Sequence, residues 1–100
     1  MKAKYRLLRT WDVRYEQVYC FDNIFLVVIT HEGSWKQDDP APRVEVCLTN
    51  AEARHMFFEY CNKLEKEGYE CIYKEVTTWN NVSVITVASK WMKKVWEVQR

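Results

Sequence analysis

The chain has 100 residues, which is enough for one domain, and we expect residues 1–100 to fold as a single unit. Its net charge of +1 excludes a protein that binds nucleic acid along its whole surface. Hydrophobic residues make up 48% of the chain and aromatic residues 15%, with only two glycines and two prolines. We expect some aromatic surface to remain outside and mark an interface, unless these rings lie half-buried at the rim of the core.

Charge is unevenly distributed along the chain. Residues 1–16 carry five basic and two acidic side chains, a sum of +3, and residues 89–100 carry four basic and one acidic, again +3. The intervening residues 17–88 carry six basic and eleven acidic side chains, a sum of −5. The ends of the chain are therefore basic and its middle is acidic.

The first predicted element is a long half-buried strand. Apolar and polar residues alternate from Lys4 to Tyr19, which is the period of a strand with one buried face. Sixteen residues exceed a usual strand, so we expect a bend or a break near residues 10–12. A turn follows at Asp22 and Asn23.

Two further strands precede the helix. Residues 24–30 are apolar on both faces, which predicts an interior strand that is covered on each side or has one face at an interface. Residues 43–48 alternate, and we expect Val44, Val46 and Leu48 to point inward. The two strands are expected to be antiparallel, joined by the loop 31–42.

The clearest element is a helix over residues 50–67. Thr49 and Glu52 have the spacing of a capping box, in which the threonine oxygen accepts from the N–H of Glu52 and the glutamate reaches back to the N–H of Thr49. Gly68 stands where a helix commonly ends in a positive-φ residue. Residues at steps of three and four form one apolar stripe: Ala53, Phe57, Tyr60, Cys61 and Leu64.

After the helix we expect a hairpin and a short second helix. Residues 69–77 and 82–88 read as strands around a turn at 78–81. Ser89 can cap a final helix whose apolar face carries Trp91, Val95 and Val98. The predicted fold is therefore α+β, a two-layer arrangement in which the long helix packs on an antiparallel sheet of about five strands.

No motif predicts a reaction or a cofactor. The chain has no glycine-rich phosphate loop and no C-x-x-C pair, and the nucleophile and base types are scattered over Cys20, Cys47, Cys61, Cys71, His31 and His55. Asp38, Asp39 and His31 could ligate a metal, but adjacent aspartates before a proline more often form a turn. We expect no enzyme, no cofactor and no metal.

The chain is expected to be cytoplasmic. Its first residues lack the apolar run of a secretion signal, and no stretch of 18 apolar residues could span a membrane. Four cysteines without a disulfide-type spacing suit a reducing compartment.

Two groups of residues could bind a partner. Trp35 and Trp79 lie in loops, where a tryptophan can anchor an interface or fold back on the sheet. The basic C-terminal segment could hold a nucleic-acid backbone, or form an amphipathic helix on the free face of the sheet. The candidate partner-binding residues are Trp35, Asp38, Asp39, Trp79, Asn80, Lys90, Lys93, Lys94 and Trp96.

In general style the chain resembles small phage or mobile-element proteins that bind and block a host factor, such as anti-CRISPR proteins. It is short, rich in aromatic residues and without a catalytic motif. We therefore expect a non-enzymatic protein-binding module, an inhibitor or adaptor acting on a host protein, and edge strands could pair two copies into a homodimer. The alternative is a nucleic-acid-binding protein that uses its two basic termini.

Overall fold

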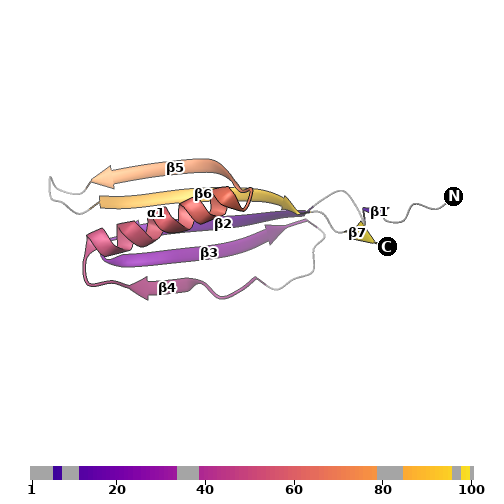
Figure 1. The fold of residues 1–100 in the computed structure, drawn as a ribbon. Coiled ribbons are helices and arrows are strands. Elements are labelled where there is room, and N and C mark those ends of the chain that lie inside the picture. The colour runs from indigo at the N-terminus through magenta and orange to yellow at the C-terminus, as the bar shows by residue number, and fades with distance from the viewer. Residues whose placement is uncertain (1–5, 8–11, 34–38, 79–84, 96–97, 100) are drawn as a thin grey trace.

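The structure of this chain is a computed structural model that describes residues 6–7, 12–33, 39–78, 85–95 and 98–99. A single helix lies among the strands of this described part (Figure 1). In chain order the elements are β1 (Arg6–Leu7), β2 (Asp12–Phe21), β3 (Ile24–Glu32), β4 (Arg43–Val46), α1 (Asn50–Lys66), β5 (Glu70–Thr78), β6 (Ile85–Val95) and β7 (Val98–Gln99).

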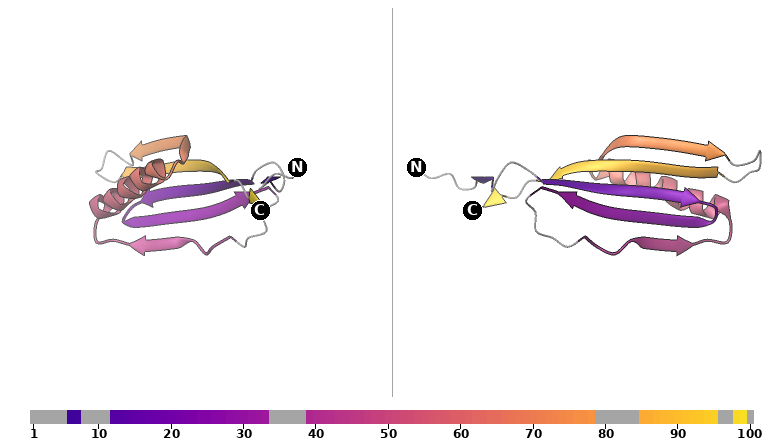
Figure 2. Two further views of the ribbon diagram at one scale, coloured as in Figure 1. Left: turned by 45° about the vertical axis from the view of Figure 1, so that its right-hand side comes forward. Right: turned by 180° about the vertical axis from the view of Figure 1, so that it is seen from behind.

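The fold has two layers, as predicted. Five strands form one antiparallel sheet in the order β4-β3-β2-β6-β5, and α1 crosses one face of it. Figure 2 shows from behind that no described element covers the other face. The short β1 and β7 pair with each other as a separate antiparallel ladder. The α+β fold and its five-stranded sheet are therefore confirmed.

The β2–β3 hairpin forms the centre of the sheet. Its two-residue turn places Asp22 at a φ of 52°, in the left-handed region that aspartate tolerates. β2 pairs with β3 on one side and with β6 on the other, so it is an interior strand of the sheet. The predicted bend or break near residues 10–12 falls mostly outside the described residues, which resume at Asp12 with β2.

The capping box at the start of α1 is confirmed in one half and corrected in the other. Thr49 Oγ1 accepts from the backbone N–H of Glu52 at 3.2 Å. The Glu52 carboxylate accepts from the N–H of Leu48 at 3.0 Å, one residue earlier than expected. At the other end Gly68 has a φ of 91°, which glycine adopts without strain from a Cβ.

Asn50 ties the first turn of α1 to the sheet. Its Nδ2 donates to the carbonyl oxygen of Asp22 in the β2–β3 turn and to that of Ile85 at 3.1 Å. Its Oδ1 accepts from the N–H of Ile85 at 3.4 Å. One amide side chain therefore fixes the helix start against the β2–β3 turn and the first residue of β6.

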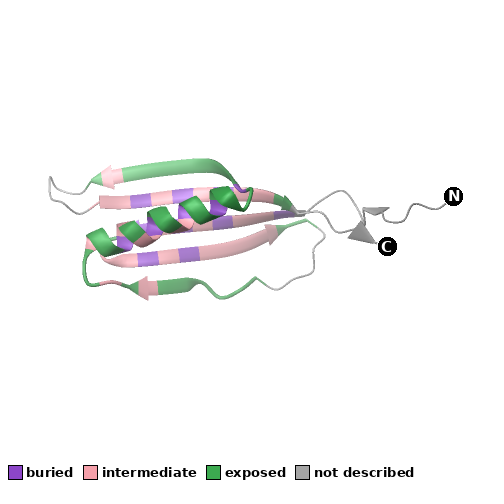
Figure 3. Ribbon diagram, viewed as in Figure 1, coloured by how far each residue is buried: buried purple, intermediate pink, exposed green. Residues whose placement is uncertain are grey.

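The core lies between α1 and the central strands (Figure 3). Alternation places one set of strand side chains beneath the helix, where those of Val18, Phe25 and Val87 are fully buried. The predicted apolar stripe of the helix meets them, with Phe57 and Leu64 at most 1% exposed. The interpretation of residues 50–67 as a helix that packs one face on the sheet is confirmed.

The expected C-terminal helix is not found, because residues 89–95 continue strand β6. Ser89 does not cap a helix but lies buried in the core, where its Oγ accepts from Trp91 Nε1 at 2.9 Å. Trp91 is likewise buried on the helix side of the sheet. Pairing with β2 outweighs the helical spacing of Trp91, Val95 and Val98.

The expected orientation of residues 43–48 is also wrong. Val44, Val46 and Leu48 are exposed by 58%, 72% and 89%. Val44 pairs with Leu26, which alternates with the buried Phe25 and so lies on the face away from α1. Arg43 lies on the helix side instead, with its guanidinium 5.4 Å above the ring of Phe25.

In the part of the chain that the structure describes, α1 is too short and too polar to cross a membrane.

The cap of α1 can be tested by a single substitution. Replacing Thr49 by alanine removes the acceptor of the Glu52 N–H and should lower the free energy of unfolding by about 1 kcal/mol, as measured by urea titration. Thr49→Ser keeps the hydroxyl and should retain most of the stability. Equal unfolding midpoints for the alanine variant and the wild type would contradict this role of Thr49.

Candidate binding surface

The structure describes four of the nine residues that the sequence predicted for partner binding. Asp39, Lys90, Lys93 and Lys94 are described, and they do not form one cluster. The remaining predicted residues, Trp35, Asp38, Trp79, Asn80 and Trp96, lie outside the described residues.

Asp39 has a local partner. Its Oδ1 lies 2.9 Å from Nδ1 of His31, which joins the end of the β3–β4 loop to β3. No group of three or more metal-ligating side chains is found among residues 6–7, 12–33, 39–78, 85–95 and 98–99. The pair His31–Asp39 by itself is a surface contact.

The two basic ends of the chain lie side by side, since β2 pairs with β6. Strand alternation nevertheless divides their described cations between the two faces of the sheet. On the helix side, Arg14 Nε lies 3.4 Å from Glu16 and Lys93 donates to the carbonyl oxygen of Glu67 at 2.8 Å. On the other side, Lys90 Nζ lies 4.7 Å from the centre of the Tyr15 ring. These cations therefore do not form one basic face.

The cysteines and histidines supply the residue types of a nucleophile and a base, and no hydrogen bond between a thiol and an imidazole is found among the described residues. All four cysteines are free thiols, and burial raises the pKa of Cys20 and of Cys61, which disfavours the reactive thiolate. The His55 side chain is 71% exposed and contacts Glu59 on the outer side of α1. The described thiols and imidazoles thus offer no nucleophile and base side by side.

A buried carboxylate lies under the C-terminal half of α1. Glu16 is 3% exposed, and its carboxylate accepts from the hydroxyl of Tyr60 and contacts Arg14. Burial raises the pKa of Tyr69 to about 12, with a further contribution from the Glu16 carboxylate. Burial and the hydrogen bond to Glu16 also raise the pKa of Tyr60. The sequence did not single out Glu16, because it occupies an ordinary strand position.

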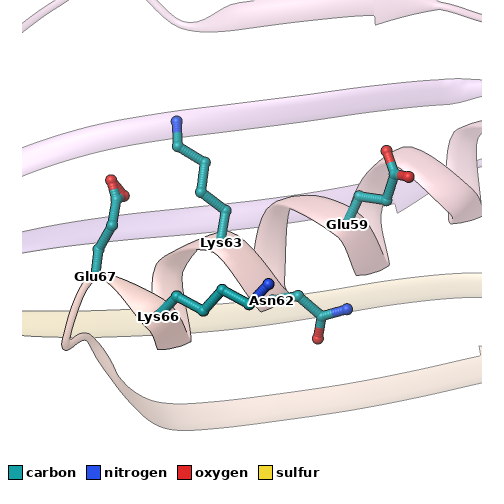
Figure 4. A pocket seen from close by; sticks show the side chains of 5 residues that line it. All are labelled: Glu59, Asn62, Lys63, Lys66 and Glu67. Atoms are coloured by element: carbon teal, nitrogen blue, oxygen red, sulfur yellow. The ribbon is translucent and has the colours of Figure 1, made fainter.

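The hollows on the helix side are poor ligand sites. One of about 600 Å³ lies along the outer surface of α1, where Lys63 is flanked by Glu59 and Glu67. Figure 4 shows that the five lining side chains all come from α1 or the residue that follows it. A smaller hollow of about 280 Å³ lies between α1 and β4, with Arg43 and Lys63 above aromatic rings. The mixed charges of both hollows favour no particular ligand.

The sheet face away from α1, here called the open face, is not covered by any described element (Figure 2). Register places on it the β2 and β3 residues that alternate with the buried Val18 and Phe25. Charged side chains lie on its β5–β6 half, where Lys90 pairs with Tyr73 and Glu75 pairs with Ala88. The β2–β3–β4 half carries no charged side chain at the seven positions that form the apolar patch defined in the next paragraph.

An apolar patch occupies the β2–β3–β4 half of the open face. Phe21 is 41% exposed on it, and the two valines of β4 are more exposed still. The patch reaches the edge of the sheet, because β4 is its outermost strand. Its members, here called the apolar patch, are Tyr19, Phe21, Ile24, Leu26, Val28, Val44 and Val46.

One sequence signal pointed to this patch. Residues 24–30 are apolar on both faces, and an interface on one face was one of the two interpretations. The contribution of β4 was missed because Val44 and Val46 were expected in the core. Alternation alone shows that a strand has two different faces, but not which of them is covered.

Comparison with known proteins gave no matching family model, no matching curated protein and no matching solved structure.

The buried carboxylate leads to a stability prediction. Tyr60→Phe removes the donor to Glu16 and leaves a buried carboxylate short of a partner, which should cost about 1–3 kcal/mol of unfolding free energy in a urea titration. Tyr15→Phe is the matched control, because its hydroxyl donates to Glu32 at an exposed position and should matter little. Equal losses for the two variants would contradict the importance of burial at Glu16.

Tyr69 leads to a prediction about alkaline pH. Its pKa rises from 10.0 to about 12 on folding, so the folded chain keeps this proton longer than the unfolded chain. The stabilisation is complete below pH 10 and is lost as the pH rises from 10 toward 12. Tyr69→Phe should therefore show a shallower fall in unfolding free energy over this window, measured by urea titration at each pH. The same slope as in the wild type would refute the prediction.

Proposed function

We propose that the chain is a non-enzymatic protein-binding module that uses the open face of its sheet. The observation that carries this proposal is the apolar patch, in which Phe21, Val44 and Val46 are 41%, 58% and 72% exposed. A surface of this kind would be costly to leave in water, and contiguous exposed apolar surface marks interaction sites.

The size of the open face suits a protein partner. Five strands at about 4.8 Å spacing and about nine residues at 3.4 Å each give a face of roughly 700 Å². A standard protein interface takes about 800 Å² from each partner. The apolar half would supply the dry centre of such an interface, and the lysines and glutamates of the β5–β6 half would supply a polar rim.

The biological role that we propose is an inhibitor or adaptor acting on a host protein, in the cytoplasm. Its support is the general style of the chain, which is shared with small phage and mobile-element proteins that block host factors. The four free thiols fit a reducing compartment.

A nucleic-acid-binding protein is the second candidate. The pairing of β2 with β6 favours it, because this pairing brings the two basic ends of the chain together. The division of their cations between two faces works against it, since a phosphate backbone is best held by cations on one surface. We therefore rank it below the protein-binding function.

The function can be tested with a pair of phenylalanines of equal exposure. Phe21 lies on the open face and is 41% exposed, whereas Phe58 lies on α1 and is 44% exposed. A tagged chain should retain a protein partner from a host lysate, with and without nuclease treatment. Phe21→Gln should reduce the amount retained about tenfold or more, because an aromatic contact of the apolar patch is lost, and Phe58→Gln should leave it unchanged.

Two outcomes would contradict the proposed surface. One is a partner that is lost with Phe58→Gln but retained with Phe21→Gln, which would move the interface to the helix side. The other is the disappearance of all partners after nuclease treatment, which would favour the nucleic-acid function. Circular dichroism of both variants checks that each has folded.

A further inference from the structure

The outer edge of β4 carries unpaired backbone groups. Cys47 donates its N–H to the carbonyl oxygen of Asn23 at 2.8 Å, so the backbone groups of odd-numbered residues here point toward β3. The N–H and C=O groups of Val44 and Val46 therefore point away from the sheet. No strand among the described residues pairs with this side of β4.

The side chains around this edge form a pattern that is complementary to itself. Arg43 and Glu45 stand on either side of Val44, on the helix side of the sheet. If two copies of the strand run antiparallel about a two-fold axis at Val44, each Arg43 faces Glu45 of the second copy. The two Val44 side chains then face each other on the open side.

The complementarity extends beyond the charged pair. Every even-numbered residue from 40 to 48 is apolar, so the same register sets Pro42 opposite Val46 of the second copy. In each of these pairs the N–H of Val46 donates to the carbonyl oxygen of Pro42. The reciprocal hydrogen bond is missing because Pro42 has no N–H. The two Val44 residues exchange both of theirs. An apolar row thus meets an apolar row while opposite charges meet on the other face.

We propose that a second copy of this chain pairs with β4 in this register to form a symmetric homodimer. The five-stranded sheets then join into one continuous ten-stranded sheet. The two-fold axis is normal to the sheet, so both open faces lie on the same side and their apolar patches become neighbours. This goes beyond the proposed function, because the dimer doubles the apolar surface that a partner meets.

The opposite edge of the sheet is less suited to a second copy. β5 is longer than β4, but its pairing with β6 is irregular between Cys71 and Tyr73, and such a bulge twists an edge away from a regular partner. A two-fold axis at the middle of β5 would set Lys74 against Lys74 of the second copy. The charges therefore oppose pairing at β5 and favour it at β4.

The first test compares two valines of equal exposure on the two edge strands. Val44 is 58% exposed and Val76 on β5 is 59% exposed. Sedimentation equilibrium over a dilution series should show a dimer for the wild-type chain and for Val76→Lys. Val44→Lys sets two ammonium groups against each other on the axis and should raise the dissociation constant about tenfold or more. A monomeric wild type, or an equal effect of both substitutions, would overturn the proposal.

The second test exchanges charges. Arg43→Glu places two acids on each strand and Glu45→Arg places two bases, so each variant alone should dimerise about tenfold more weakly. Mixing them should restore a dimer that contains one chain of each kind, detectable by native mass spectrometry. The double variant Arg43→Glu/Glu45→Arg should also dimerise like the wild type. Failure of both restorations would overturn this register.

These tests are separate from the test of the proposed function. Arg43 and Glu45 lie on the helix side of the sheet, whereas Phe21 lies on the open face of β2. A chain that is monomeric but loses its partner with Phe21→Gln would refute the dimer and leave the function standing. A dimer that binds no protein partner would refute the function and leave the dimer standing.

Discussion

One helix has to cover one face of a five-stranded sheet, and the rest of the structure depends on this constraint. α1 has 17 residues and is about 25 Å long, but a helix with its side chains is only about 10 Å wide. The sheet is roughly 24 Å wide at about 4.8 Å per strand. α1 therefore buries the middle of one face, and no other described element covers the edge strands or the opposite face (Figure 2).

On the buried side, hydrogen bonds fix the position of α1 on the sheet. Asn50 bonds to the β2–β3 turn and to β6 at the start of the helix, and Tyr60 bonds to the buried Glu16 in its second half. A buried carboxylate is tolerated only where hydrogen bonds and charges compensate it, so these bonds define how the helix lies across the sheet. Among the described residues of the open face, the side-chain hydrogen bond from Tyr15 to Glu32 lies outside the apolar patch.

The sequence was a good guide to local structure. The helix and its cap at Thr49 were predictable because they depend on residues close together in the chain. The Asp22 turn was predictable for the same reason. The end of the chain was not predictable. The spacing of Trp91, Val95 and Val98 suits a helix, yet residues 87–95 pair along β2, 67 to 83 residues away in sequence. Long-range pairing overrides local spacing.

The binding surface was harder to predict than the fold. The tryptophans that suggested an interface, Trp35 and Trp79, lie outside the described residues, and the lysines of β6 are divided between two faces. The apolar patch comes from Val44 and its neighbours. Apolar and polar residues alternate in the same way whether the apolar side chains of a strand are buried or exposed. Only the position of α1 determines which face is inside, and that position depends on contacts between distant segments.

We expect the open face to be accessible in the isolated chain and thus available to a partner. The most direct measurement is methyl NMR of the dilute chain with a soluble paramagnetic probe, which broadens signals from exposed side chains. The account predicts strong broadening for Leu26 and Val46 on the open face, and little for the buried Val18 and Val87. Equal protection of all four would show that the chain covers this face itself, and would contradict the account.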